Sequence, residues 1–184
     1  MKLYAVKPTR AGGLSTIGPV WSPDGVRLDD LDAPSPYEIN HGVVRLDEVL
    51  PLGDRLMSVR DLMVVSEQAR RVLEPLAPPE YLYFLPTRVM SPDGKEELSR
   101  YFSVITKERL DAIDYDRSEF VYFHGLPDMI RNVTKWSFRE DALPPFELFL
   151  SKYGHWIGTQ RAVWAIETTG LTGFECKLIW ESDD

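Results

Sequence analysis

The chain has 184 residues, of which 43% are hydrophobic and 27% charged, and its 29 acidic and 21 basic residues give a formal net charge of −8. This length and composition predict one globular domain over residues 1–184, and the acidic balance argues against binding to nucleic acid or to an anionic membrane. The lone Cys176 excludes an intrachain disulfide and a cysteine-based zinc site. The N-terminus has no signal-peptide pattern and no apolar run approaches a membrane span, so we expect a cytoplasmic protein.

The N-terminal part of the chain contains few signals of regular structure. Residues 3–6, "LYAV", predict a short strand that ends at Pro8. The remainder of residues 1–45 is rich in Pro, Gly, Ser and Asp, so we expect an extended, loop-rich segment. The tetrapeptide "SPDG" occurs at 22–25 and again at 91–94. Pro, Asp and Gly in this order suit successive positions of a reverse turn, so both copies predict turns.

The strongest local pattern is "DLMVVSEQARRVLEPLAPPEYLYFLP". An apolar run at 62–65 predicts a buried strand, and Ser66 follows it where a helix N-cap belongs. Two prolines at 78–79 stop the helix, and the aromatic run at 81–85 predicts a strand that ends before Pro86. The helix itself is indicated by apolar residues at helical spacing, namely Ala69, Val72, Leu73 and Leu76.

A similar succession occupies residues 155–179, with Thr159 at the N-cap position. Ser66 and Thr159 are 93 positions apart, and at this offset Ala69 matches Ala162 and Leu73 matches Ile166. Two explanations stay open: an internal duplication of a strand–helix–strand unit, or two unrelated units with the same local physics. The C-terminal unit closes with "GLTGFE" at 170–175, in the order helix, glycines, strand. A phosphate-binding loop has the opposite order, so we interpret Gly170 as a helix C-terminal glycine and Gly173 as a turn residue.

Five further strands are predicted between these units. They begin with a strand at 101–105 and one at 119–123, and continue in "DMIRNVTKWSF" and "PFELFLSKYGHWI", with residues 151–154 as a hairpin turn. The sum is an α+β fold with a mixed, largely antiparallel sheet and two main helices packed on it.

The sequence contains no recognisable catalytic, cofactor-binding or metal-binding constellation. The three histidines, His41, His124 and His155, have no metal-ligand spacing, and Cys176 lies in a strand-like run typical of a structural thiol. We read the five tryptophans as core residues, except that Trp21 beside a turn is a candidate binding residue. Two acidic loops are either solvated surface or a partner-binding face. The candidate partner-binding residues are therefore Trp21, Asp29, Asp30, Asp32, Asp114 and Asp116.

The order of these motifs resembles that of a bacterial family of immunity proteins of polymorphic toxin systems, immunity family eleven. The resemblance covers about residues 40–180 and depends on "LMVVSEQARRVLE", "YLYFLP", "YFSVIT" with "LDAIDYDRSEF", and above all "AIETTGLTGFECKLI". The chain departs from the family pattern at "WIGTQR", where the family tends toward an apolar–Val–Ser–Glu helix start.

The resemblance implies a small non-enzymatic binder that neutralises a cognate toxin by covering its active site. The charge of −8 would suit a basic toxin, because complementary charge accelerates association. The resemblance brings no catalytic residue or cofactor with it. Two other hypotheses stay open, a non-inhibitory adaptor of a secretion or surface system and a small enzyme that uses the acidic loops. The sequence does not distinguish a monomer from a homodimer.

Overall fold

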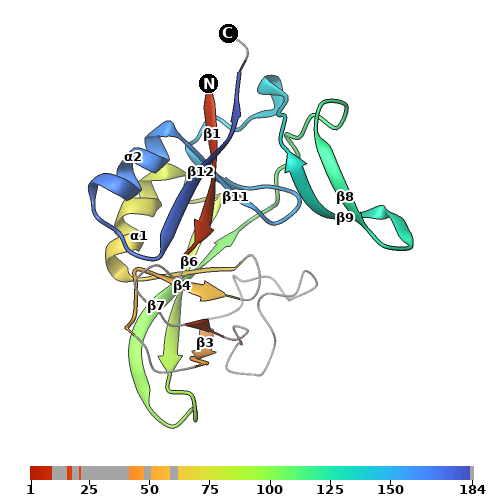
Figure 1. The fold of residues 1–184 in the computed structure, drawn as a ribbon. Helices are drawn as coiled ribbons and strands as arrows, with labels where there is room; N and C mark the ends of the chain where they lie inside the picture. Colours follow the sequence, from red (N-terminus) through yellow and green to blue (C-terminus); the bar gives the residue numbers. More distant parts are fainter. Residues whose placement is uncertain (10–15, 18–20, 22–41, 48–50, 59–61, 183–184) are drawn as a thin grey trace.

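The computed structural model describes residues 1–9, 16–17, 21, 42–47, 51–58 and 62–182. Most of the segment that we predicted to be loop-rich, including the first "SPDG" copy, His41, Asp29, Asp30 and Asp32, lies outside these residues. The described part contains two main helices and three groups of strands (Figure 1), which confirms the predicted α+β class.

The two ends of the chain meet in a four-stranded antiparallel sheet. The first strand, β1 (Lys2–Pro8), lies between β11 (Trp156–Thr159) and the last strand, β12 (Phe174–Glu181). The hairpin partner of β11 is β10 (Leu148–Leu150), so the order is β10-β11-β1-β12. The predicted turn at residues 151–154 separates β10 from β11.

The second sheet is mixed and has six strands in the order β2-β4-β5-β7-β6-β3. The pairs β2–β4 and β3–β6 are parallel, whereas the other neighbours are antiparallel. The second "SPDG" copy forms the predicted turn between β6 and β7, where Gly94 has φ of 74°. The strands are β2 (Thr16–Ile17), β3 (Gly42–Arg45), β4 (Arg55–Ser58), β5 (Met63–Val65), β6 (Leu82–Met90) and β7 (Glu97–Thr106).

One strand boundary differs from the sequence prediction. We expected the strand at 81–85 to stop before Pro86, but β6 continues through Pro86 to Met90. Pairing between β6 and β3 begins at Thr87, so the missing N–H of Pro86 lies outside that ladder. On its other side β6 pairs with β7 from Leu82 to Met90, so the strand continues through the proline.

The two helices begin as predicted but are capped differently. Helix α1 (Glu67–Leu73) starts after Ser66, whose hydroxyl accepts a hydrogen bond from the N–H of Ala69 at 3.1 Å. A 3-10 turn at Glu74–Leu76 follows it. Helix α2 (Gln160–Thr168) starts after Thr159, but the Thr159 hydroxyl makes no cap bond and donates instead to the carboxylate of Glu147. Local spacing alone mispredicts the hydrogen bond of the Thr159 hydroxyl, because its partner, Glu147, is distant in the sequence.

The two strand–helix–strand units share one topology. In the first unit, β5 and β6 flank β7 and are both antiparallel to it; in the second, β11 and β12 flank β1 in the same way. Each helix therefore connects two parallel strands that have an antiparallel strand between them. The matched helix positions, Ala69 with Ala162 and Leu73 with Ile166, are all buried. The similarity that we noted along the sequence thus extends to the arrangement of the strands.

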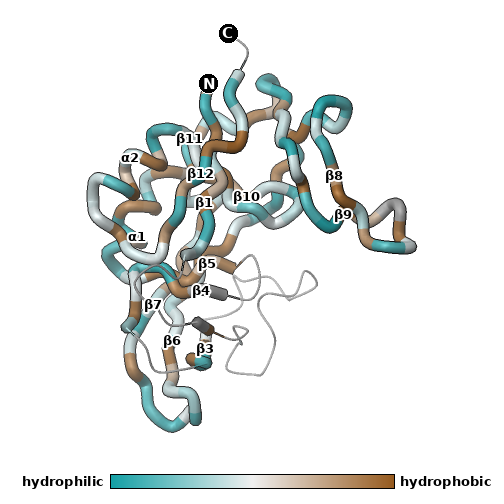
Figure 2. Tube along the Cα trace, in the orientation of Figure 1, coloured by the Kyte–Doolittle hydropathy of each residue, from teal (hydrophilic) through white to brown (hydrophobic). Residues whose placement is uncertain are grey.

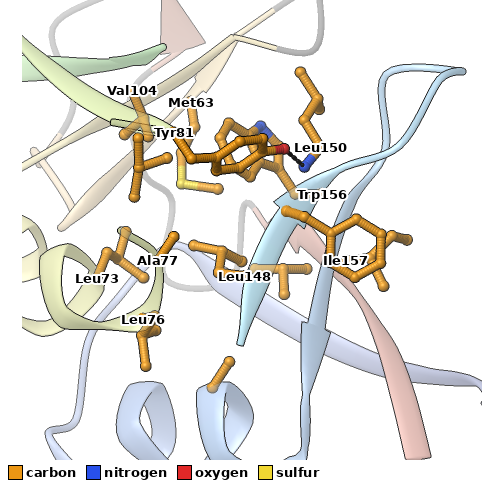
Figure 3. Packing of buried hydrophobic residues seen from close by; sticks show 14 of the residues in the cluster. Met63, Leu73, Leu76, Ala77, Tyr81, Val104, Leu148, Leu150, Trp156 and Ile157 are labelled. Carbon is orange, nitrogen blue, oxygen red and sulfur yellow. Dashed lines mark hydrogen bonds between the residues drawn. The ribbon is translucent and has the colours of Figure 1, made fainter. Parts of the chain in front are cut away.

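The helices lie side by side and pack on the larger of the two hydrophobic clusters that the described residues form (Figures 1 and 3). Tyr81 lies in this cluster, and its phenol oxygen accepts a hydrogen bond from the N–H of Leu150 at 2.9 Å (Figure 3). Burial is the main cause that raises the pKa of Tyr81 to about 12, so the phenol stays protonated. The smaller cluster belongs to the six-stranded sheet and consists of Ile17, Val44, Leu46, Leu56, Val64, Val89 and Tyr101.

The glycine-containing loop at 170–173 fastens the second unit to the six-stranded sheet. Gly170 follows α2 with φ of 67°, as a helix C-terminal glycine does, and Gly173 has φ of 83°. Thr172 and Asp54 exchange hydrogen bonds: the Asp54 N–H donates to Thr172 Oγ1 at 3.0 Å, and the Thr172 N–H donates to Asp54 Oδ2 at 2.9 Å. The Asp54 carboxylate also accepts from Ser66 at 2.6 Å, which ties the loop to the start of α1.

Gly173 makes the closest backbone approach in this loop. A Cβ at Gly173 would lie 2.3 Å from the carbonyl oxygen of Arg55, whereas a Cβ at Gly170 would meet nothing within 4 Å. The buried Arg55 side chain crosses to the other sheet, where it donates to the carbonyl of Val6 at 3.1 Å. Gly170 and Gly173 therefore have the structural roles that the order of helix, glycines and strand predicted, and the loop also joins the two sheets, which the sequence did not indicate.

Candidate partner-binding site

A tight turn at residues 114–118 forms one wall of the candidate site. The Asp114 carboxylate accepts hydrogen bonds from the N–H groups of Asp116 and Arg117 at 3.1 and 3.2 Å, and the Asp114 N–H donates to Ser137 at 2.9 Å. Asp114 therefore holds the turn together, and only part of its side chain is exposed. Asp116 is exposed and extends from the same turn.

The turn borders an open groove of about 1140 Å³. The other walls come from residues 135–141 and from the end of β12. Six carboxylate side chains line the groove against three cationic ones, so its electrostatic character is acidic. The carboxylates are those of Asp114, Asp116, Glu119, Glu140, Asp141 and Glu181, and the cations are Arg117, Lys135 and Arg139.

Aromatic rings line the same groove. Trp136 and Phe138 stack with centroids 5.6 Å apart, and Trp180 meets Phe138 edge-on at 5.8 Å. Trp136 also packs edge-on against His155 at 5.2 Å. Trp136 and Trp180 are only partly buried, so the groove offers aromatic surface as well as negative charge. Exposed aromatic and acidic groups together suit a partner with Lys or Arg side chains.

A two-stranded hairpin begins at this groove and extends away from the rest of the chain (Figure 1). Its strands are β8 (Glu119–Phe123) and β9 (Leu126–Lys135). Glu119 and Lys135, at the base of the hairpin, line the groove. Figure 2 shows hydrophobic stretches along this hairpin. The exposed apolar side chains are Val121, Tyr122, Phe123, Leu126 and Met129, each between 42% and 53% exposed.

A network of polar groups supports the base of the hairpin. The Tyr115 hydroxyl donates to Asp111 at 2.9 Å, and Lys152 donates to Asp111 at 2.8 Å and to Tyr115 at 3.1 Å. Partial burial alone would raise the pKa of Asp111, but the hydrogen bonds from Lys152 and Tyr115 lower it. Burial, together with the hydrogen bonding of Tyr153 and Asp111, raises the pKa of Tyr115 to about 12.

Aromatic contacts join this network to β8. Phe120 stacks on Tyr115 with centroids 5.7 Å apart and meets Tyr153 edge-on at 6.2 Å. Phe120 thus anchors the hairpin to the body of the chain, while the next three residues of β8 are exposed. The position of the hairpin is therefore fixed at its base, and its outer part is left without cover from the described residues.

The predicted site residues do not converge. Asp114 and Asp116 lie in the acidic groove, whereas Trp21 bridges to Val43 of β3, in the six-stranded sheet. Trp21 is 42% exposed and lines a smaller groove of about 420 Å³ with Arg45 and Arg88. Asp29, Asp30 and Asp32 lie outside the described residues, so their part in a site stays a prediction.

One interpretation of the tryptophans was wrong. Trp156 is buried, and Trp136 and Trp180 are partly buried, but Trp164 on α2 is 65% exposed and is the most exposed tryptophan described. It occupies the solvent face of a helix whose buried face is formed by Ala162, Val163 and Ile166. The exposed surface of β8 did not follow from the sequence pattern, which predicts only a strand at these residues. The low charge of this segment was a signal in the sequence. The eleven residues from Phe120 to Ile130, which lie on both sides of the turn at His124 and Gly125, contain a single charged residue, Asp128.

The histidines and the cysteine that the structure describes occupy structural positions. His124 lies in the hairpin turn, and His155 contacts Trp136. Burial raises the pKa of Cys176 to about 11, which keeps the thiol protonated at neutral pH. Within the described ranges, no group of three or more His, Cys, Asp or Glu side chains is arranged to hold a metal ion.

The groove and the hairpin offer charged and apolar surface of the kind found in protein–protein interfaces. The family comparison is in line with a protein that binds another protein: the model of the Imm11 immunity protein family matches residues 44–179. The chain belongs to this family, and toxin neutralisation is the general function that membership implies. No curated protein matches the chain. In the part of the chain that the structure describes, neither helix has the length and apolar character needed to cross a membrane.

Proposed function

We propose that this protein binds one cognate bacterial toxin in the cytoplasm and neutralises it by covering the active site, without catalysis of its own. The observation that carries this proposal is the acidic, aromatic groove at the base of an exposed apolar hairpin, in a chain of the Imm11 family. A groove of this kind supplies both a charged rim and apolar contact surface, which are the parts of a protein–protein interface.

The electrostatics of the groove favour a basic toxin. Asp116, Glu140 and Asp141 are exposed carboxylates on the groove, and the chain as a whole carries a net charge of −8. Charges at the rim of an interface act mainly on the rate of association and on its salt dependence. We therefore expect fast binding at low salt, with a slower association rate when ionic strength rises.

Co-expression with the neighbouring genes tests the proposal. The experiment uses a neighbouring gene whose expression alone arrests growth. This gene is expressed with and without the gene for this chain, and the two protein products are co-purified. We expect rescue of growth and a stoichiometric complex. A complex without rescue would indicate the adaptor, and rescue without a complex would indicate an enzyme; either result overturns the proposal.

The charge reversal Asp116→Lys tests the electrostatic part separately. With the isolated complex, we expect Asp116→Lys to slow association several-fold at low salt and to have a smaller effect at 0.5 M salt. Glu80→Lys is a matched control, because Glu80 is also an exposed carboxylate but lies in the turn before β6. Equal effects of the two substitutions would refute a specific role of the groove.

A further inference from the structure

We infer that the β8–β9 hairpin is inserted into a concave, apolar cleft of the partner toxin, with the acidic groove resting on the rim of that cleft. This inference deepens the proposed function and depends on it. It names the part of the chain that enters the toxin and the chemistry of the surface that receives it.

The hairpin is exposed on both faces. Successive residues of a strand point to opposite sides, so Val121 and Phe123 lie on one face of β8 and Tyr122 on the other. All three are more than 40% exposed. An isolated two-stranded ribbon is marginally stable unless something packs on it, and a flat partner surface would cover only one of its faces. A cleft covers both.

The outer part of the ribbon carries few charges. Its tip, from Phe120 to Ile130, contains one charged residue, Asp128, and Arg131 follows in β9, next to the partner of Tyr122. The residues that bound the ribbon, Glu119 and Lys135, are charged and lie on the groove. Exposed apolar groups on the outer part and charged groups at the base reproduce the usual arrangement of an interface, with a desolvated centre and a polar rim. The centre of the interface is therefore the ribbon and the rim is the groove.

The ribbon is irregular along its length. The register shifts three times along β8–β9, so β9 has ten residues where β8 has five. Extra residues of this kind bend a strand and re-aim its side chains, and they are typical of strands near functional sites. The bulged ribbon projects from an anchored base at Phe120, which presents its outer half to a partner (Figure 1).

A second copy of this chain is a poorer occupant than a toxin cleft. The acidic groove is lined by six carboxylate side chains, so it complements a basic surface better than the mainly apolar ribbon of a second copy. A basic rim on the toxin would complement the exposed carboxylates of the groove, Asp116, Glu140 and Asp141, while its apolar cleft encloses the ribbon.

The test uses the full-length chain and an inactivated form of the toxin. The toxin is the product of the neighbouring gene whose expression without this chain arrests growth. Two variants remove apolar surface from opposite faces of β8: Val121→Ser with Phe123→Ser, and Tyr122→Ser. Trp164→Ser is the matched control, because Trp164 is an exposed apolar residue on α2. Thermal unfolding checks that every variant keeps the melting temperature of the wild type within a few degrees.

Insertion predicts that both hairpin variants raise the dissociation constant by about 30-fold or more and abolish rescue, while Trp164→Ser changes neither. An effect of only one face would mean that the ribbon lies flat on a surface, and an effect of Trp164→Ser alone would move the interface to α2. Sedimentation of the free chain gives a further outcome: a dimer that the double variant, Val121→Ser with Phe123→Ser, dissociates would assign the hairpin to self-association. Each of these results overturns the inference. Failure of the wild type itself to rescue growth would instead overturn the proposed function.

Discussion

Replacement of Gly173 by Ala should destabilise the protein far more than the same replacement at Gly170, although the two glycines are three positions apart. Both have positive φ, of 67° at Gly170 and 83° at Gly173. An L-residue in this region costs about 1–2 kcal/mol, and the lower entropy of the unfolded chain with Ala returns roughly half of that. We therefore expect Gly170→Ala to lower the free energy of unfolding by about 1 kcal/mol.

Gly173 has a second constraint that Gly170 lacks. A Cβ at Gly173 would lie 2.3 Å from the carbonyl oxygen of Arg55, so the backbone of one element has to move. Overpacking of this kind costs about 1–3 kcal/mol. A shift of the loop also strains the hydrogen bonds between Thr172 and Asp54, each of which contributes about 1 kcal/mol. The total for Gly173→Ala is about 3–5 kcal/mol.

Urea unfolding of the two variants, followed by circular dichroism, measures this difference. We expect the midpoint of Gly173→Ala to fall well below that of Gly170→Ala, with the slope m unchanged. In thermal unfolding the corresponding loss is about 10 °C, since 1 kcal/mol shifts the melting temperature by about 2–4 °C at this chain length. Equal losses for the two variants would refute the account of the 170–173 loop as a close-packed junction between the sheets.

Three other predictions concern single groups. Tyr81→Phe leaves the buried N–H of Leu150 without its acceptor and should lower the free energy of unfolding by about 1–3 kcal/mol in denaturant titration; no loss would mean that water replaces the phenol. Because burial raises the pKa of Cys176 from 9.0 to about 11, folding favours the protonated thiol, and the stability from this shift is fully present below pH 9 and is lost as pH rises toward 11. Alkylation of the folded chain should accordingly increase with a midpoint near pH 11, and a midpoint near 9 would contradict burial of the thiol. Asp114→Ala removes the acceptor of two backbone N–H groups and should cost about 1–2 kcal/mol, whereas Asp116→Ala on the exposed side of the same turn should stay within about 0.5 kcal/mol of the wild type.

Local physics made several elements predictable from the sequence. Ser66 caps α1, "SPDG" at 91–94 turns the chain, and Gly170 ends α2, because each depends on residues within one turn of itself. The α+β class followed from the periodicity of the same segments.

Features that depend on distant partners were not predictable in this way. Thr159 looks like an N-cap, yet its hydroxyl bonds to Glu147, and the Asp54–Thr172 pair joins residues 118 positions apart. Periodicity showed that β8 is a strand but not whether another element covers it, so the exposure of Tyr122 and Phe123 appeared only in three dimensions. The same reasoning applies to Trp164, whose place on the outer face of α2 depends on which face of the helix packs inward.

The central claim is that the β8–β9 hairpin and the acidic groove form the surface that binds the toxin. Hydrogen–deuterium exchange of this chain, alone and saturated with the inactivated toxin, tests it most directly, because the exchange rate of each segment reports its cover by the partner. The account predicts that the complex slows exchange at residues 114–135 and 139–141 and leaves α2 unchanged. Protection at α2 or around Trp21, with unchanged exchange in the hairpin, would contradict it.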